Sequence, residues 1–202
     1  MARPGARQRP VALLLLVALL PVLGGCVPLL VGGAAVGAAA AYDRRGYAAF
    51  FDDQQIEFNA AAALDSEPGL KGQGRISVTS YNYVVLLTGQ VHTEAEAALA
   101  AGLVSRLPKV RKVVNELTIG PEIDLARKGE DLLLTSRAKL ALFNVAVPGF
   151  DPTRVKVVTE NGVVYLLGLV SVAEGNAAVE QVRYVPGVVR VVKLFEYQDP
   201  QT

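Results

Sequence analysis

Few residues in this chain have the types and spacing that catalysis requires. The 202 residues include one Cys and one His, which excludes a Cys or His cluster for a metal and a disulfide within the chain. Asp52 and Asp53 are adjacent, but helical neighbours point about 100° apart, which favours a charged N-terminal turn over a catalytic pair. For His92, beside Thr93 and Glu94, we expect a solvated or capping role. No Ser-His-Asp set or phosphate loop appears, so we expect no enzyme activity and no metal.

The single Cys follows an export signal. A basic start is followed by a ten-residue apolar run, Val11–Leu20, which is too short to span a bilayer. Leu23-Gly24-Gly25-Cys26 resembles the lipobox of bacterial lipoproteins. That resemblance implies cleavage before Cys26, diacylglycerol on its sulfur and an acyl chain on its amino group, with no other cofactor. The alternative is a free or buried thiol near an uncleaved anchor. In such lipoproteins, Asp at the position after the lipidated Cys retains the protein in the inner membrane. This chain has Val27 there, which implies an outer-membrane location.

The remainder of the chain contains two copies of one module. An offset of 79 residues aligns 75–91 with 154–170, and an offset of 78 aligns 107–117 with 185–195. Each copy predicts a helix, a hairpin, a second helix and a third strand. The first helices are expected at about 52–64 and 131–143, the second at 93–106 and 172–184, and the third strands at 110–119 and 188–197. Because each module is small, we expect the two to pack on each other.

The two hairpins differ at their turns. Asn161-Gly162 is a strong signal for a two-residue turn, in which both residues need positive φ. The first copy has Asn82-Tyr83 there, which is a weaker signal because Tyr tolerates positive φ poorly, and a longer or bulged turn is the alternative. The strand glycines favour bulges or tight packing over a ligand site, so the structural hairpin glycines are Gly89, Gly162 and Gly168.

These residues resemble the BON-domain family. The resemblance lies in the core hairpin and the entry to the third strand. These segments are 157–170 and 185–192 in the second copy, and 84–91 and 107–115 in the first. The resemblance implies an α+β fold of two tandem α-β-β-α-β modules, each a three-stranded sheet covered by two helices. The expected organisation is a signal peptide at 1–25, a lipidated apolar tether at 26–51, BON domains at 52–120 and 131–197, and a linker at 121–130. A lipobox with two BON modules is similar to periplasm-facing outer-membrane lipoproteins that bind anionic phospholipid and maintain the envelope.

Charge points to the second module as the lipid-binding one. The chain has a formal charge of +1, which argues against nucleic acid as a partner. Residues 52–125 hold 6 basic and 10 acidic side chains, net −4, whereas 126–197 hold 9 and 7, net +2. Leu133, Arg137 and Leu140 form a helical stripe that offers apolar insertion and attraction to acidic headgroups. The other predicted phospholipid-binding residues are Lys139, Arg127 and Lys128.

Two alternatives remain open from the sequence. Leu133 and Leu140 could instead pack against the first module. The whole protein could also be an adaptor that binds envelope or division proteins and contacts the membrane only through its anchor. The equivalent helix of the first copy contains Asp52, Asp53 and Glu57 and few large apolar residues, so we expect it to be a poor lipid binder and an acidic docking face. The oligomeric state is not predicted.

Overall fold

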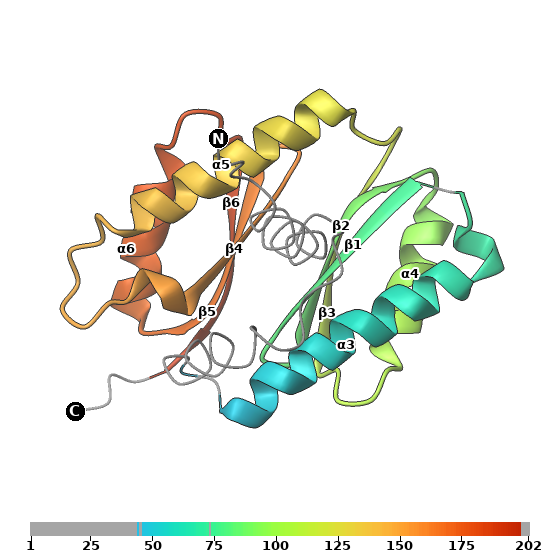
Figure 1. Ribbon diagram of the computed structural model, residues 1–202, viewed down its shortest axis with the longest axis horizontal. Helices are drawn as coiled ribbons and strands as arrows, with labels where there is room; N and C mark the ends of the chain where they lie inside the picture. The colour runs from blue at the N-terminus through green and yellow to red at the C-terminus, as the bar shows by residue number, and fades with distance from the viewer. Residues whose placement is uncertain (1–43, 45, 73, 199–202) are drawn as a thin grey trace, which may run out of the picture. The chain divides into compact units, whose positions relative to one another are not determined.

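Both repeats fold into the same five main elements. The computed structural model describes residue 44 and residues 46–72 and 74–198, so the leader, Cys26, Val27 and most of the tether lie outside the described residues. The first module, from α3 to β3 in Figure 1, contains α3 (Tyr47–Ser66), a short 3-10 turn η1 (Pro68–Leu70), β1 (Gly74–Tyr81), β2 (Val84–Val91), α4 (Glu94–Ser105) and β3 (Lys112–Ile119).

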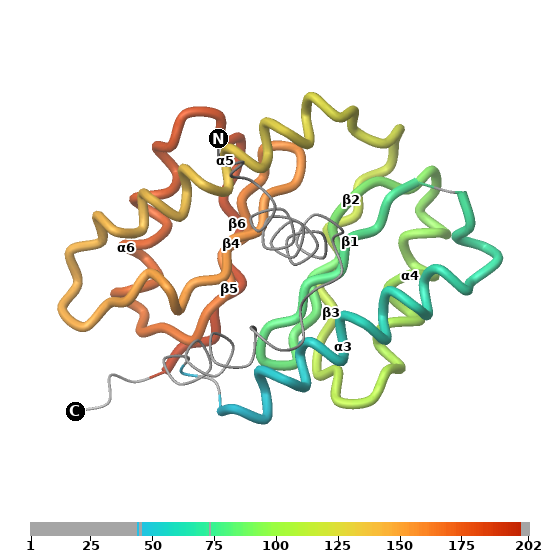
Figure 2. The backbone as a smooth tube through the Cα atoms, viewed as in Figure 1, coloured from blue at the N-terminus to red at the C-terminus, as the bar shows by residue number. Residues whose placement is uncertain are grey.

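The second module repeats that order. It contains α5 (Leu125–Leu142), a 3-10 turn η2 (Pro152–Arg154), β4 (Val155–Glu160), β5 (Val163–Val170), α6 (Val172–Arg183) and β6 (Arg190–Tyr197), which the backbone tube in Figure 2 follows from yellow to red. The predicted α-β-β-α-β order and the α+β class are confirmed. Two helices begin earlier than expected: α3 starts inside the predicted tether at Tyr47, and α5 starts inside the predicted linker at Leu125.

Each sheet has its second strand in the centre. The strand orders are β1-β2-β3 and β4-β5-β6, with the hairpin pair antiparallel and the outer pair parallel. The parallel pair needs a crossover, which α4 supplies in the first module and α6 in the second. As a result β2 and β5 are hydrogen-bonded on both edges and buried along nearly their whole length.

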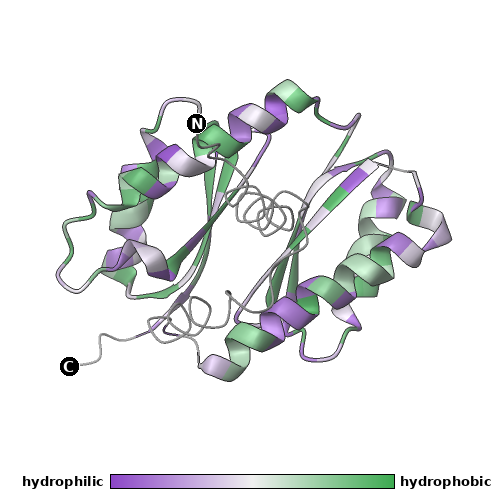
Figure 3. Cartoon of the chain, in the orientation of Figure 1, coloured by the Kyte–Doolittle hydropathy of each residue, from purple (hydrophilic) through white to green (hydrophobic). Residues whose placement is uncertain are grey.

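Two helices cover one face of each sheet. Alternate residues of the central strands point toward them: Val85 and Leu87 join the core under α3 and α4, and Val164 and Leu166 join the core under α5 and α6. Ala60 and Ala100 in the first module, and Ala138 and Ala178 in the second, are fully buried, which allows helix and sheet to approach closely. Figure 3 shows hydrophobic colour along the strands of both sheets.

The hairpin turn of the first module is not the longer or bulged alternative. Asn82 and Tyr83 both have positive φ, 49° and 66°, so the turn has two residues, as in the second module, where Asn161 and Gly162 have φ of 48° and 77°. Tyr83 is held in this conformation because its backbone N–H donates to Asp53 Oδ1 at 2.8 Å and its hydroxyl donates to Asp52 Oδ2 at 3.2 Å. Tertiary hydrogen bonds thus outweigh the local preference of Tyr.

The helix-free faces of the two sheets face each other. A third apolar cluster contains Tyr81 and Leu86 from the first module and Tyr165, Leu167 and Leu169 from the second. The described residues of the two modules accordingly belong to one compact unit, as expected for modules this small. The Tyr165 hydroxyl donates to Glu116 Oε2 across the interface at 3.4 Å, and burial raises the pKa of this hydroxyl.

Ion pairs and hydrogen bonds surround this apolar cluster. Glu160 is buried and accepts hydrogen bonds from Arg75 at 3.0 Å and from Gln90 Nε2 at 2.9 Å. Lys156 Nζ donates to Glu57 Oε1 at 2.8 Å. Further pairs join Arg190 to Glu116 and Arg111 to Glu196. These contacts are related by the internal repeat. At the 79-residue offset, Arg75 corresponds to Arg154 and Tyr81 corresponds to Glu160. Arg75 pairs with Glu160, and the Tyr81 hydroxyl correspondingly donates to the carbonyl oxygen of Arg154 at 3.3 Å.

In the described part of the chain, none of the helices combines the length and apolar character needed to cross a bilayer.

Candidate functional site

Helix α5 carries an exposed apolar stripe on the side opposite the sheet. Leu133 is 58% exposed and Leu140 is 67% exposed, so the first module does not cover them. At about 100° per residue, the exposed apolar side chains fall within an arc of about 100°. They are Leu125, Leu132, Leu133, Leu140 and Phe143. The arrangement presents an apolar ridge to its surroundings, interrupted by Gly129 and Ser136.

The opposite side of α5 fixes this ridge in orientation. Leu134, Ala138 and Leu142 are buried in the core of the second module. Asp131 is also buried, and its carboxylate accepts hydrogen bonds from the backbone N–H groups of Asn161 at 2.6 Å and Gly162 at 2.8 Å. The helix is therefore attached to both the core and the hairpin turn, and it cannot rotate about its axis without breaking these contacts.

The predicted cations divide into two groups. Arg137 and Lys139 are exposed on either side of the apolar ridge, and among the described residues no carboxylate lies within ion-pair distance of them. Arg127, in contrast, bonds Glu130 at 2.7 Å and Asn161 at 3.0 Å, and Lys128 pairs with Glu122. Arg137 and Lys139 are thus the cations available to an anionic partner.

The structure adds residues that sequence reasoning missed. Leu125 and Leu132 lie in the segment around the predicted linker boundary, and Phe143 ends the helix. Leu132 and Phe143 fall within the predicted helix at 131–143 and, at −8 and +3 from Leu140, share its face. Only Leu125, at −15, needed the helix to be extended toward its N-terminus.

The corresponding helix α3 does not have the acidic face that the sequence predicted. All three of its carboxylates between 47 and 62 point toward the protein: Asp53 is buried against the hairpin turn, Glu57 accepts from the backbone N–H of Ser80, and Asp52 pairs with Lys109. The hydrogen bond from Lys109 lowers the pKa of Asp52. The exposed side of α3 instead carries Tyr47, Phe51 and Phe58.

The remaining candidates show no constellation for catalysis. His92 is exposed, and its backbone N–H donates to Glu96 Oε2 at 2.8 Å. The described residues contain no group of three His, Cys, Asp or Glu side chains arranged for a metal. Gly89 has a φ of 120°, and a side chain there would collide with the carbonyl oxygen of Arg75, whereas Gly168 faces the carbonyl of Arg154 closely. These two glycines allow close strand approach, and Gly162 allows the turn.

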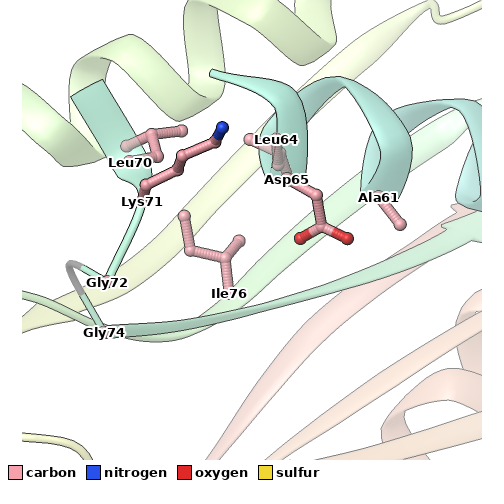
Figure 4. A pocket seen from close by; sticks show the side chains of 8 residues that line it. All are labelled: Ala61, Leu64, Asp65, Leu70, Lys71, Gly72, Gly74 and Ile76. Atoms are coloured by element: carbon pink, nitrogen blue, oxygen red, sulfur yellow. The ribbon is translucent and has the colours of Figure 1, made fainter. Parts of the chain in front are cut away.

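A small open cavity lies beside the C-terminal end of α3 in the first module. It measures about 290 Å³ and opens between the end of α3, the turn after it and the start of β1. Figure 4 shows Leu64, Leu70 and Ile76 lining it, with one carboxylate, Asp65, and one amine, Lys71. Its lining contains no nucleophile or base in a catalytic arrangement, so α5 remains the better candidate site.

Comparison with known proteins identifies the family. The model of the BON domain matches residues 52–121 and 134–199. The chain is 39% identical over 178 residues to the outer membrane lipoprotein DolP of Haemophilus influenzae. The aligned region covers 88% of this chain and 91% of that protein. It is 36% identical over 146 residues to a 21 kDa hemolysin of Actinobacillus pleuropneumoniae, covering 72% of this chain and 74% of that one.

Among solved structures, the chain matches CdsD, a structural protein of the type III secretion system of Chlamydia trachomatis. The identity is 20%, the TM-score is 0.29, and the match covers 72% of this chain and 63% of the other. That likeness is too low to bear on function. The two BON matches and the identity to DolP along nearly the whole chain, in contrast, agree with the tandem modules described above. The chain therefore belongs to the BON-domain family and is a lipid-anchored outer-membrane lipoprotein with two BON domains.

Proposed function

We propose that this lipoprotein faces the periplasm and supports envelope integrity by binding anionic phospholipid through α5 of its second BON domain. One observation carries the proposal: the exposed apolar ridge of α5 is flanked by Arg137 and Lys139, whose charges no carboxylate in the described residues neutralises. Apolar side chains can enter the acyl boundary while the cations remain at headgroup level, as in interfacial helices.

The expected magnitudes are adequate for a second membrane contact. Fully burying a Leu or Phe side chain contributes about 1.5–3 kcal/mol, and each basic residue near an anionic surface contributes about 1 kcal/mol. The lipid anchor, with diacylglycerol and an acyl chain on Cys26, would already hold the protein at the membrane. Helix α5 would then orient the second domain against the bilayer and select for acidic headgroups.

Liposome flotation tests this proposal without the anchor. A variant that begins at residue 26 and carries Cys26→Ser should float with liposomes containing phosphatidylglycerol or cardiolipin, and much less with phosphatidylcholine alone. Leu133→Glu or Leu140→Glu should abolish flotation, because a carboxylate replaces an inserting side chain. Replacing Arg137 and Lys139 together by Gln should weaken it by about 30-fold, since two contributions of about 1 kcal/mol are lost.

A matched control distinguishes the loss of cations beside the α5 ridge from the loss of positive charge anywhere on the protein. Arg183→Gln removes a cation from α6, where it pairs with Glu180, and should leave flotation unchanged. Binding that ignores acidic lipid, or that survives Leu133→Glu, would contradict the proposal. It would favour the adaptor alternative, in which the membrane is contacted through the anchor alone.

A further inference from the structure

Helix α3 has an exposed aromatic face that the lipid-binding proposal does not use. Tyr47 is 57% exposed, Phe51 is 56% exposed and Phe58 is 74% exposed. Phe51 contacts the neighbouring Phe50 edge to face, with ring centroids 5.7 Å apart. Three large apolar side chains on one side of a 20-residue helix form a surface that a partner would cover.

This face is uncharged over about four turns. The exposed residues of α3 from 47 to 62 are all neutral: Tyr47, Ala48, Phe51, Gln54, Gln55, Phe58, Ala61 and Ala62. The carboxylates of the same segment point inward, where they cap the hairpin turn or pair with Lys109 and Lys156. Two copies of this face can therefore meet without repulsion between like charges.

The spacing along the face is that of a helix-pairing seam. Tyr47, Phe51, Gln54, Phe58, Ala61 and Asp65 are separated by 4, 3, 4, 3 and 4 residues, and all six are exposed. An alternation of 3 and 4 is the spacing of the a and d positions in paired helices. The buried positions of the same helix, among them Ile56 and Ala60, lie on the other side and pack on the sheet.

We propose that two copies of the protein pair through α3 as an antiparallel, two-fold symmetric helix dimer. With the axis at residue 56, facing residues have numbers that sum to 112. Phe51 then meets the partner's Ala61, a large residue against a small one, and Gln54 meets the partner's Phe58. At each end the hydroxyl of Tyr47 meets the carboxylate of the partner's Asp65. The two helix dipoles are antiparallel.

The composition of the face favours a second copy over a lipid surface. Gln54, Gln55 and Asp65 lie in or beside the seam, where an acyl environment would leave them without hydrogen-bond partners. The exposed part of this helix between 47 and 62 also lacks the cations that flank the ridge of α5. A helix pair, in contrast, can satisfy amide and carboxylate groups across its own seam.

Membrane attachment makes a small interface sufficient. A seam of 19 residues is only about 28 Å long, so the pairing would be weak between freely diffusing chains. Anchoring both copies in one membrane raises their effective concentration. The 21 residues from Cys26 to Tyr47 can extend to about 70 Å, so both anchors reach the same bilayer from opposite ends of the pair.

Site-directed crosslinking of the full lipoprotein in its membrane tests both pairing and direction. The only native Cys is Cys26, whose thiol the proposed diacylglycerol would block, so each introduced cysteine would be the only reactive thiol in its chain. Gln54→Cys should crosslink to itself with a short bismaleimide, because its mate lies about 6 Å away along the helix axis. Ala48→Cys should not, because its mate is about 24 Å away. Differently tagged copies carrying Ala48→Cys and Asp65→Cys should crosslink to each other.

A charge in the seam should separate the copies. Phe58→Glu in the Gln54→Cys background should reduce the crosslinked fraction at least about fivefold, whereas Ala98→Glu on the exposed side of α4 should not. Circular dichroism would confirm that both variants are folded. Self-crosslinking at Ala48→Cys, crosslinks only to another polypeptide, no crosslink at any position, or persistence in Phe58→Glu would each overturn the proposal.

Discussion

At the scale of single residues, one buried carboxylate in each module connects the first helix to the hairpin. Asp53 and Asp131 are both buried, and each accepts hydrogen bonds from two consecutive backbone N–H groups of the turn. Asp53 also accepts from the hydroxyl of Ser80 at 2.7 Å. The two residues occupy equivalent positions in the repeat, at an offset of 78. This contact explains how the turn of the first module tolerates Tyr83.

Replacing Asp53 should therefore destabilise the protein far more than replacing its neighbour. Asp53→Asn puts an amide group among buried N–H donors, and we expect a loss of about 1–3 kcal/mol in the free energy of unfolding. Asp52→Asn removes an ion pair at the surface and should lose less than about 1 kcal/mol. Urea denaturation measures both variants. Equal losses would show that Asp53 has no special role in holding the turn.

At the scale of elements, the N-terminus of α6 is capped by a network of hydrogen bonds and an ion pair rather than by one side chain. Ser171 Oγ accepts from the N–H of Glu174, and Glu174 Oε2 accepts from the N–H of Ser171 at 2.6 Å. Arg44 donates to both carboxylate oxygens of Glu174, at 2.8 and 2.9 Å. Burial alone would raise the pKa of Glu174, but the hydrogen bonds from Arg44 and Ser171 hold it below the ordinary value of 4.5.

This network should give α6 a pH-dependent contribution to stability. The pKa of Glu174 is lower in the folded state than in the unfolded state. The ionised carboxylate therefore stabilises the fold fully at pH values above the unfolded-state pKa, and this stabilisation is lost as the pH falls through the folded-state pKa. Glu174→Gln should lower the free energy of unfolding by about 1 kcal/mol at pH 7, as for a lost helix cap. The difference from the natural protein should shrink below pH 4.5.

Denaturant titrations from pH 7 to pH 3 measure this effect. Glu180→Gln, on the exposed side of the same helix, is the matched control and should show little change at any pH. A difference for Glu174→Gln that stays constant down to pH 3 would show that the carboxylate charge contributes nothing.

The elements also show what the sequence could predict and what it could not. The strands, the Asn161-Gly162 turn and the stripe of Leu133 and Leu140 follow from local periodicity, which residue order records directly. The face of α3 was predicted incorrectly because Asp52 and Asp53 were read as solvent-exposed charge. Their direction depends on partners about 30 to 57 residues away, at the hairpin turn and at Lys109, and no local pattern reveals such partners.

At the scale of the whole molecule, the two modules are joined by an apolar cluster and ion pairs between their sheets. Glu160 is the most enclosed of the carboxylates between them, with Arg75 and Gln90 as its donors. The interface should make the two modules unfold together. Their small individual cores make such coupling important for the stability of each.

Removing Glu160 should weaken that coupling. We expect Glu160→Ala to lose about 1–3 kcal/mol, because it leaves the buried amide of Gln90 without its acceptor. Differential scanning calorimetry should show one transition for the natural protein and a broader or divided transition for the variant. Glu130→Ala, at an exposed pair with Arg127, is the control. A single sharp transition with an unchanged midpoint in Glu160→Ala would contradict this role.

The reciprocal contacts between Arg75 and Glu160, and between Tyr81 and Arg154, are those of a dimer whose two subunits have been fused into one chain. A true homodimer of single modules must present every surface twice, in opposite directions. Fusion removes that restriction, because the two copies can change independently while the shared interface keeps them together. One copy of the helix can then keep a cationic, leucine-rich surface while the other becomes neutral and aromatic, and a single anchor serves both.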